Sequence, residues 1–138
     1  MRLYRGLKQP FDPERLPEPA VPGAIRSGTD FTDCPFAALA YASGRRGVMI
    51  VLDLPNPPPV WVSEETWSLD TPRARRMMVW GRYAKYVVAE IPAKELRVQV
   101  RRKGVGAQSD AYKGALLADF IKHWIRDSSA TASATHVV

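Results

Sequence analysis

The sequence has few residues that bind metals or form disulfides. Its 138 residues include one cysteine, Cys34, and two histidines, His123 and His136. A single cysteine excludes an internal disulfide and a cysteine-based zinc cluster, and two histidines offer little for a metal to hold. We therefore expect no metal cofactor.

Long apolar runs are also lacking. No run approaches the roughly 18 residues of a membrane span, and the first residues, MRLYRGLKQP, lack the apolar centre of a signal peptide. These absences predict no membrane partner and a cytoplasmic location, either in the producing cell or in a host. The hydrophobic content of 46% is enough to form a core, and the length fits one domain.

Common nucleotide-binding and hydrolase motifs are missing as well. The chain contains no GxxxxGK[ST] and no GxGxxG after an expected strand, which argues against a P-loop and a Rossmann site. His123 lies in an amphipathic helical segment, where a surface or capping role suits it better than membership of a Ser-His-Asp triad.

Positive charge is concentrated in the second half of the chain. Residues 1–70 contain 7 Lys/Arg and 9 Asp/Glu, residues 71–126 contain 13 and 4, and Asp127 adds one acid. The three parts carry −2, +9 and −1, which sum to the net charge of +6. Such a surplus of positive charge can attract phosphates, nucleotides or nucleic acid. The alternative is that these charges only keep the surface of strands and helices solvated.

Hydrophobic patterning predicts one α+β domain over residues 1–127 with a mixed, mainly antiparallel sheet flanked by helices. We expect strands at 1–6, 48–54, 60–63, 83–91 and 96–103. We expect helices at 35–44, 63–67 and 70–81, and a last one that begins at Ser109 or Asp110.

Three further segments have distinctive composition. Residues 9–26 contain five prolines, which prevents regular structure over most of that length and predicts an ordered loop or lid. Thr32 or Asp33 is expected to cap the helix that begins near Pro35. Residues 128–138 have low complexity and predict a disordered tail.

Three motifs in this chain together resemble the ADP-ribosyltransferase-like fold family. They are LYRG at 3–6, GTDFTDCPFAALAYA at 28–42 and YAKYVVAEIPAKELRV at 83–98. In that family the first strand supplies an arginine or histidine that holds NAD, a Ser/Thr-containing segment follows, and a later strand supplies a catalytic glutamate. The resemblance therefore implies this fold and NAD as a substrate.

Position by position, the resemblance implies that Arg5, followed by Gly6, holds NAD. It also implies that Thr29 and Thr32 orient the nicotinamide ribose. An arginine suits its role because a guanidinium can form forked hydrogen bonds with phosphate. Phe31 or Tyr41 is a candidate to stack on the nicotinamide ring, and core packing is an equal alternative for each.

The third motif departs from the family pattern, because Lys85 stands where the glutamate is expected. That carboxylate stabilises the positive charge that develops as nicotinamide leaves, a task that a cation cannot perform. Glu90 lies five residues further on and would face the opposite side of a regular strand. Glu90 could supply the catalytic carboxylate only if the strand had a bulge or a shifted register. Glu64 and Glu65 are other candidates for this role.

Three functions stay open. The first is ADP-ribosyl transfer from NAD to an unknown macromolecular acceptor, protein or nucleic acid, by a toxin, a phage effector or another modifier. The second resembles RNA 2′-phosphotransferases, which handle phosphate with basic residues, here Arg5, Arg82 and Lys85. The third is a non-catalytic module that binds nucleotides or nucleic acid through a basic face, with Arg73, Arg76 and Arg82 as phosphate contacts.

Overall fold

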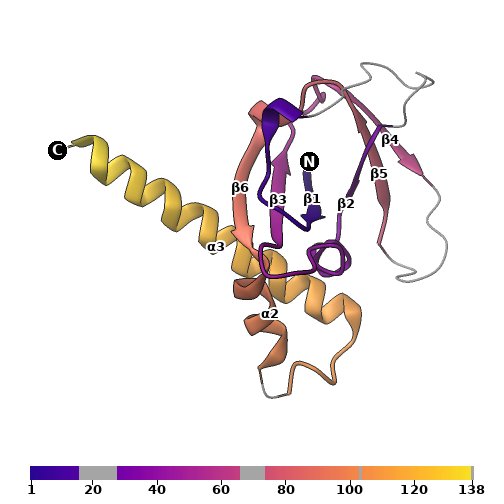
Figure 1. The fold of residues 1–138 in the computed structure, drawn as a ribbon, viewed down its shortest axis with the longest axis vertical. Coiled ribbons are helices and arrows are strands. Elements are labelled where there is room, and N and C mark those ends of the chain that lie inside the picture. The colour runs from indigo at the N-terminus through magenta and orange to yellow at the C-terminus, as the bar shows by residue number, and fades with distance from the viewer. Residues whose placement is uncertain (16–27, 66–73, 103, 138) are drawn as a thin grey trace.

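The computed structural model describes residues 1–15, 28–65, 74–102 and 104–137. Its six strands form one sheet in the order β4-β5-β2-β1-β3-β6 (Figure 1), and every pair of neighbours is antiparallel. The strands are β1 (Arg2–Leu7), β2 (Thr29–Thr32), β3 (Val48–Asp53), β4 (Trp61–Glu65), β5 (Arg76–Trp80) and β6 (Val87–Pro92). The α+β class is confirmed, and the sheet, which was expected to be mixed and mainly antiparallel, is antiparallel throughout.

Three α-helices and two short 3-10 turns complete the described elements. The helices are α1 (Pro35–Leu39), α2 (Ala93–Arg101) and α3 (Asp110–Val137), and the turns are Pro13–Arg15 and Ala84–Tyr86. The start of α3 confirms the prediction, because the Ser109 hydroxyl accepts a hydrogen bond from the Tyr112 amide at 3.2 Å. This is the geometry of an N-cap.

Each face of the sheet carries an apolar core. On one face, side chains from β1, β3 and β6 pack against the three helices, with Met49, Leu96 and Leu117 fully buried. On the other face, Leu3, Phe31, Ile50, Leu52, Val79 and Tyr83 form a second cluster. The continuous apolar run of β3 supplies both clusters, as expected for a strand that is buried on both sides.

Two predicted helices are wrong. Residues within 63–67 and 70–81 were expected to be helical, but β4 ends at Glu65 and β5 covers Arg76–Trp80, while residues 66–73 lie outside the described part. β5 lies between β2 and β4, and Met77 to Trp80 are all buried. Pairing on both edges and burial on both faces therefore outweigh the helical signal of the flanking arginines.

The predicted strand at 96–103 is also wrong, because Ala93–Arg101 form α2. Ala93 and Leu96 are fully buried and Val100 is partly buried, which is the spacing of a helix face, whereas Val98 is 55% exposed. The alternating pattern of 96, 98 and 100 thus coincided with a helical one. The neighbouring strand, predicted from 83, begins only at Val87 after the 3-10 turn.

Helix boundaries differ as well. α1 ends at Leu39, five residues before Gly44, and its N-cap residue is Cys34 with no side-chain cap. Thr32 Oγ1 instead accepts a hydrogen bond from the Cys34 amide at 3.2 Å, and Asp33 pairs with Arg75. α3 continues to Val137, where a disordered tail was expected, because alanine favours helix and no glycine or proline follows Gly114. The domain limits of 1–127 stay a prediction.

Candidate functional site

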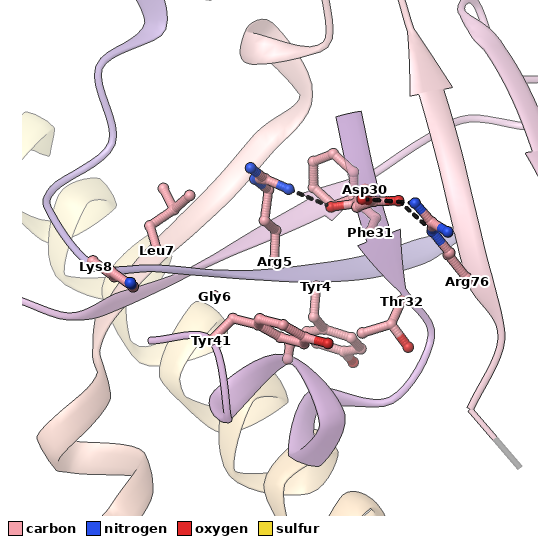
Figure 2. A pocket seen from close by; sticks show the side chains of 11 residues that line it. Tyr4, Arg5, Gly6, Leu7, Lys8, Asp30, Phe31, Thr32, Tyr41 and Arg76 are labelled. Carbon is pink, nitrogen blue, oxygen red and sulfur yellow. Dashed lines mark hydrogen bonds and ion pairs between the residues drawn. The ribbon is translucent and has the colours of Figure 1, made fainter. Parts of the chain in front are cut away.

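A cavity of about 560 Å³ lies where β1 and β2 separate. All six residues of β1 pair with β3, but a single pair, Tyr4 with Thr32, joins β1 to β2. The cavity therefore meets side chains from both faces of the sheet. Its lining consists of Tyr4, Arg5, Gly6, Leu7, Lys8, Asp30, Phe31, Thr32, Ala38, Tyr41 and Arg76 (Figure 2).

Gly6 lets α1 close one side of this cavity. A Cβ atom at Gly6 would lie 2.1 Å from the Ala38 carbonyl oxygen and 2.8 Å from the Ala42 amide nitrogen. Only a residue without a side chain permits this approach. As a result, Ala38 and Tyr41 reach the cavity from the helix side of β1.

Arg5 and Asp30 lie on either side of the gap. Arg5 Nη1 donates to the Asp30 carbonyl oxygen at 2.9 Å, while the Asp30 carboxylate accepts from Arg76 Nε at 2.6 Å and from Nη2 at 3.1 Å. Figure 2 shows Arg5 on one side of β1, with Tyr4 and Tyr41 on the other. A guanidinium has five N–H donors, so the bond to Asp30 leaves most of those on Arg5 for a ligand.

The cavity combines positive charge with aromatic surface. Arg5, Lys8 and Arg76 outnumber the single acid Asp30, which gives the lining a net charge of +2. Tyr41 is 53% exposed, so its ring is accessible to a planar ligand. Net positive charge and an open aromatic ring favour an anionic ligand with a planar group.

Two other residues of the cavity lining, Phe31 and Tyr4, have buried side chains that pack in the apolar cores. Phe31 is buried and meets Tyr83 edge-on with ring centroids 5.1 Å apart, so it packs in the core and only borders the cavity. Tyr4 is buried on the opposite face, and this burial raises the pKa of its hydroxyl above the ordinary value. Tyr4 therefore stays neutral near pH 7.

Several of the residues predicted for the site do line this cavity. They are Arg5, Gly6, Phe31, Thr32, Tyr41 and, from the predicted phosphate contacts, Arg76. Thr29 lies on β2 in register with Val79 and does not line the cavity. Arg82 is exposed just after β5, also outside the lining, and Arg73 lies outside the described residues.

The predicted catalytic residues Glu90 and Lys85 lie outside the cavity lining. Glu90 is in register with Ile50, and Ile50 with Arg5, so Glu90 and Arg5 share one face about 10 Å apart between Cα atoms. Glu90 Oε1 accepts a hydrogen bond from the Phe11 amide at 2.6 Å. Lys85 lies in the 3-10 turn, not on a strand, with Nζ 5.2 Å from the centroid of the Tyr86 ring.

The other acidic candidates lie on edge strand β4. Glu64 lies on edge strand β4, where Oε2 is 3.5 Å from Arg75 Nη1. Glu65 ends the same strand in register with Arg76. Glu64 is not among the residues that line the cavity.

Sequence reasoning missed Tyr4, Leu7, Lys8, Asp30 and Ala38 in the lining. For Leu7 and Lys8 the available signal was their position in the sequence, since they closely follow Arg5 along the chain. Asp30 belongs to the GTDFTDCPFAALAYA motif, but neither the resemblance nor the capping pattern assigns it a role. Its partner Arg76 is 46 residues away, and no local pattern connects the two.

The described residues contain neither a membrane-spanning helix nor a group of side chains that could hold a metal ion. No helix among them is both long enough and apolar enough to cross a membrane. Within the same ranges, no three His, Cys, Asp or Glu side chains are grouped so that they could hold a metal ion.

Comparison with known proteins adds no assignment. No protein-family model, no curated protein and no solved structure matches this chain. The resemblance to ADP-ribosyltransferases therefore stays a prediction from the three sequence motifs.

Proposed function

We propose that the cavity beside Arg5 binds NAD and that the protein transfers ADP-ribose to a macromolecular acceptor. One observation carries this proposal. Four residues predicted to contact NAD, Arg5, Gly6, Thr32 and Tyr41, line a single cavity, although they come from β1, β2 and the turn after α1. Its volume of about 560 Å³ lies within the usual range for small-molecule sites.

The charges and rings of the lining support a dinucleotide ligand. Arg5 and Lys8 provide donors for a pyrophosphate, and the exposed Tyr41 ring provides a surface for a base or a nicotinamide ring. Thr32 Oγ1 already accepts the Cys34 amide, so its hydroxyl hydrogen remains available to donate to a ribose. Together these groups match the phosphates, rings and sugars of NAD.

The proposed reaction breaks the N-glycosidic bond of NAD. Nicotinamide leaves with the bonding electron pair, an acceptor nucleophile bonds to the ribose carbon, and the acceptor loses a proton. A carboxylate would stabilise the positive charge that develops on the ribose. Glu90 is the candidate because it shares the sheet face of Arg5, with Ile50 between them.

The proposal assigns no chemical step to Lys85, since this side chain lies outside the cavity and beside Tyr86. It also requires the ligand to extend from Arg5 across β3 toward β6. The Phe11 amide, which now occupies Glu90 Oε1, would then share that carboxylate with a ribose hydroxyl or yield it.

The test compares two arginines of the same strand. Arg5 lines the cavity, whereas Arg2 pairs with Asp53 at the other end of β1 at 3.1 Å. We expect Arg5→Ala to weaken NAD binding by roughly 10-fold to 100-fold in calorimetry, since a hydrogen bond to a charged group contributes about 1.5–3 kcal/mol. Arg2→Ala should bind NAD like the wild type. Equal affinities for both variants would show that the site is not at Arg5.

A second pair of variants tests the catalytic carboxylate. Glu90→Gln should bind NAD normally but release nicotinamide roughly 100-fold more slowly, since it loses electrostatic stabilisation of the transition state. Glu95→Gln on α2 is the matched control and should behave like the wild type. Undiminished release by Glu90→Gln would remove Glu90 from the mechanism and leave the binding site intact.

A further inference from the structure

Three separate segments meet at one end of the sheet. Leu7, Val48 and Pro92 lie in register across β1, β3 and β6. From this row Lys8 follows Leu7, the turn 43–47 leads into Val48, and α2 with its cap, residues 93–102, follows Pro92. We call these segments, Lys8, 43–47 and 93–102, the basic end.

One hydrogen bond joins two of these segments, and a second joins α2 to the residue just before the turn 43–47. The Ala93 amide donates to the Gly47 carbonyl oxygen at 2.9 Å, and the Arg97 guanidinium donates to the Ala42 carbonyl oxygen. The turn 43–47 therefore lies against the first two turns of α2. Figure 1 shows α2 at the same end of the sheet as the start of β3.

The basic end carries the whole net charge of the chain. It contains seven Lys/Arg and one acid, Glu95, which gives +6, the net charge of the full sequence. The rest of the chain has 13 Lys/Arg and 13 Asp/Glu. The cations of the basic end are Lys8, Arg45, Arg46, Lys94, Arg97, Arg101 and Arg102.

Most of these cations are exposed, and the described ion pairs do not neutralise them. Lys8, Arg45, Arg46, Lys94, Arg101 and Arg102 are exposed, whereas Arg97 is half-buried. The ion pairs found between described residues join other side chains, among them Arg2 with Asp53 and Arg76 with Asp30, and none includes a cation of the basic end. An uncompensated cluster of this size attracts a polyanion.

We infer that the basic end binds the backbone of a single-stranded nucleic acid. Lys94, Arg97 and Arg101 follow one side of α2 over about 10 Å, a length that meets several phosphates in succession. Tyr41 is 53% exposed just before the turn 43–47 and offers a ring on which a base can stack. Lys8 belongs both to the basic end and to the cavity lining, so the bound strand passes the cavity mouth.

The structure favours this partner over an anionic membrane. A helix that lies in a membrane surface needs an exposed apolar face. In α2 that face is occupied, because Ala93 and Leu96 are fully buried in the core, and Val98 is the exposed large apolar side chain of the helix. The basic end can therefore contact a polyanion without inserting into lipid.

The experiment measures fluorescence anisotropy of a labelled oligothymidylate of about 12 nucleotides, and of the matching oligouridylate, with the full chain. With about five phosphate contacts, we expect affinity to fall roughly 100-fold between about 50 and about 200 mM salt. The double variants Arg45→Glu/Arg46→Glu and Lys94→Glu/Arg101→Glu should each lose at least about tenfold in affinity and show a shallower salt dependence.

The control makes the same change of charge elsewhere. Lys122→Glu/Arg126→Glu replaces two exposed cations of α3 outside the basic end and should keep the wild-type affinity. Equal losses in the control and test variants would overturn the inference. So would equal competition by polyglutamate at matched charge, or tighter binding to anionic phospholipid vesicles than to either oligonucleotide. None of these readouts uses NAD, so the inference can fail or hold independently of the proposed function.

Discussion

Replacing Gly6 by alanine should destabilise the fold at the wall of the cavity. A Cβ atom there would lie 2.1 Å from the Ala38 carbonyl oxygen, whereas real Cβ contacts are essentially never shorter than 3.0 Å. β1 and α1 must therefore separate by nearly 1 Å, the difference between these distances. β1 cannot easily give way, because it is paired along its whole length with β3.

The cost follows from this clash with backbone atoms. Overpacking costs about 1–3 kcal/mol, and contact with two backbone atoms places Gly6→Ala near the upper end. The lower chain entropy of unfolded alanine offsets roughly 0.5–1 kcal/mol. We expect a net loss of about 2 kcal/mol in the free energy of unfolding, which is roughly 1 M in the urea midpoint and about 8 °C in Tm.

Urea unfolding of the wild type, Gly6→Ala and Gly106→Ala measures this loss directly. Gly106 has open space around its Cα and no positive φ, so its alanine variant should differ from the wild type by less than about 0.5 kcal/mol. If Gly6→Ala proves as stable as Gly106→Ala, the close approach of α1 to β1 is refuted. The account of how Ala38 and Tyr41 reach the cavity would then fail.

Two further predictions concern cavity residues. Burial raises the pKa of Tyr4, so the stability it contributes is complete below about pH 10, the unfolded value, and is lost as the pH rises toward the native value. Between about pH 8 and about pH 10.5, the urea midpoint should therefore fall more for the wild type than for Tyr4→Phe. The control Tyr112→Phe removes an exposed tyrosine and should behave like the wild type. Equal falls in all three proteins would contradict this prediction. Asp30→Asn should cost less than about 1 kcal/mol in thermal melts, because Asp30 and Arg76 are 45% and 40% exposed. The same change raises the lining charge from +2 to +3 and should tighten NAD binding, and weaker binding would contradict the assigned role of the cations.

The sequence predicted those elements whose pattern has one interpretation. β3 and the start of α3 were identified because a continuous apolar run of six or seven residues indicates a strand and a capped helical pattern indicates the start of a helix. β5 was not, since Met77 to Trp80 are apolar in both a strand and a buried helix, and only the neighbours β2 and β4 decide between them. The prediction for α2 was wrong for the same reason, because apolar residues at 96 and 100 fit the period of a strand as well as that of a helix.

The site was predictable where the residues are local in sequence and not where the fold brings them together. Arg5 and Gly6 follow from one short motif, and Thr32 and Tyr41 from another. The bidentate pair of Asp30 and Arg76 spans 46 residues and depends on the alignment of β2 with β5. The sequence did not predict that the cations of the basic end form one cluster, because its three segments are adjacent only through the register of β1, β3 and β6.

Titration of the wild-type chain with NAD, followed by calorimetry and by nicotinamide release in the same sample, tests the central claim most directly. The account predicts saturable heat of binding at one site, together with release of nicotinamide once an acceptor is present. Saturable binding that Arg5→Ala weakens roughly 10-fold to 100-fold would support the cavity even without release. Absence of both heat and nicotinamide release would contradict the claim that this cavity binds NAD.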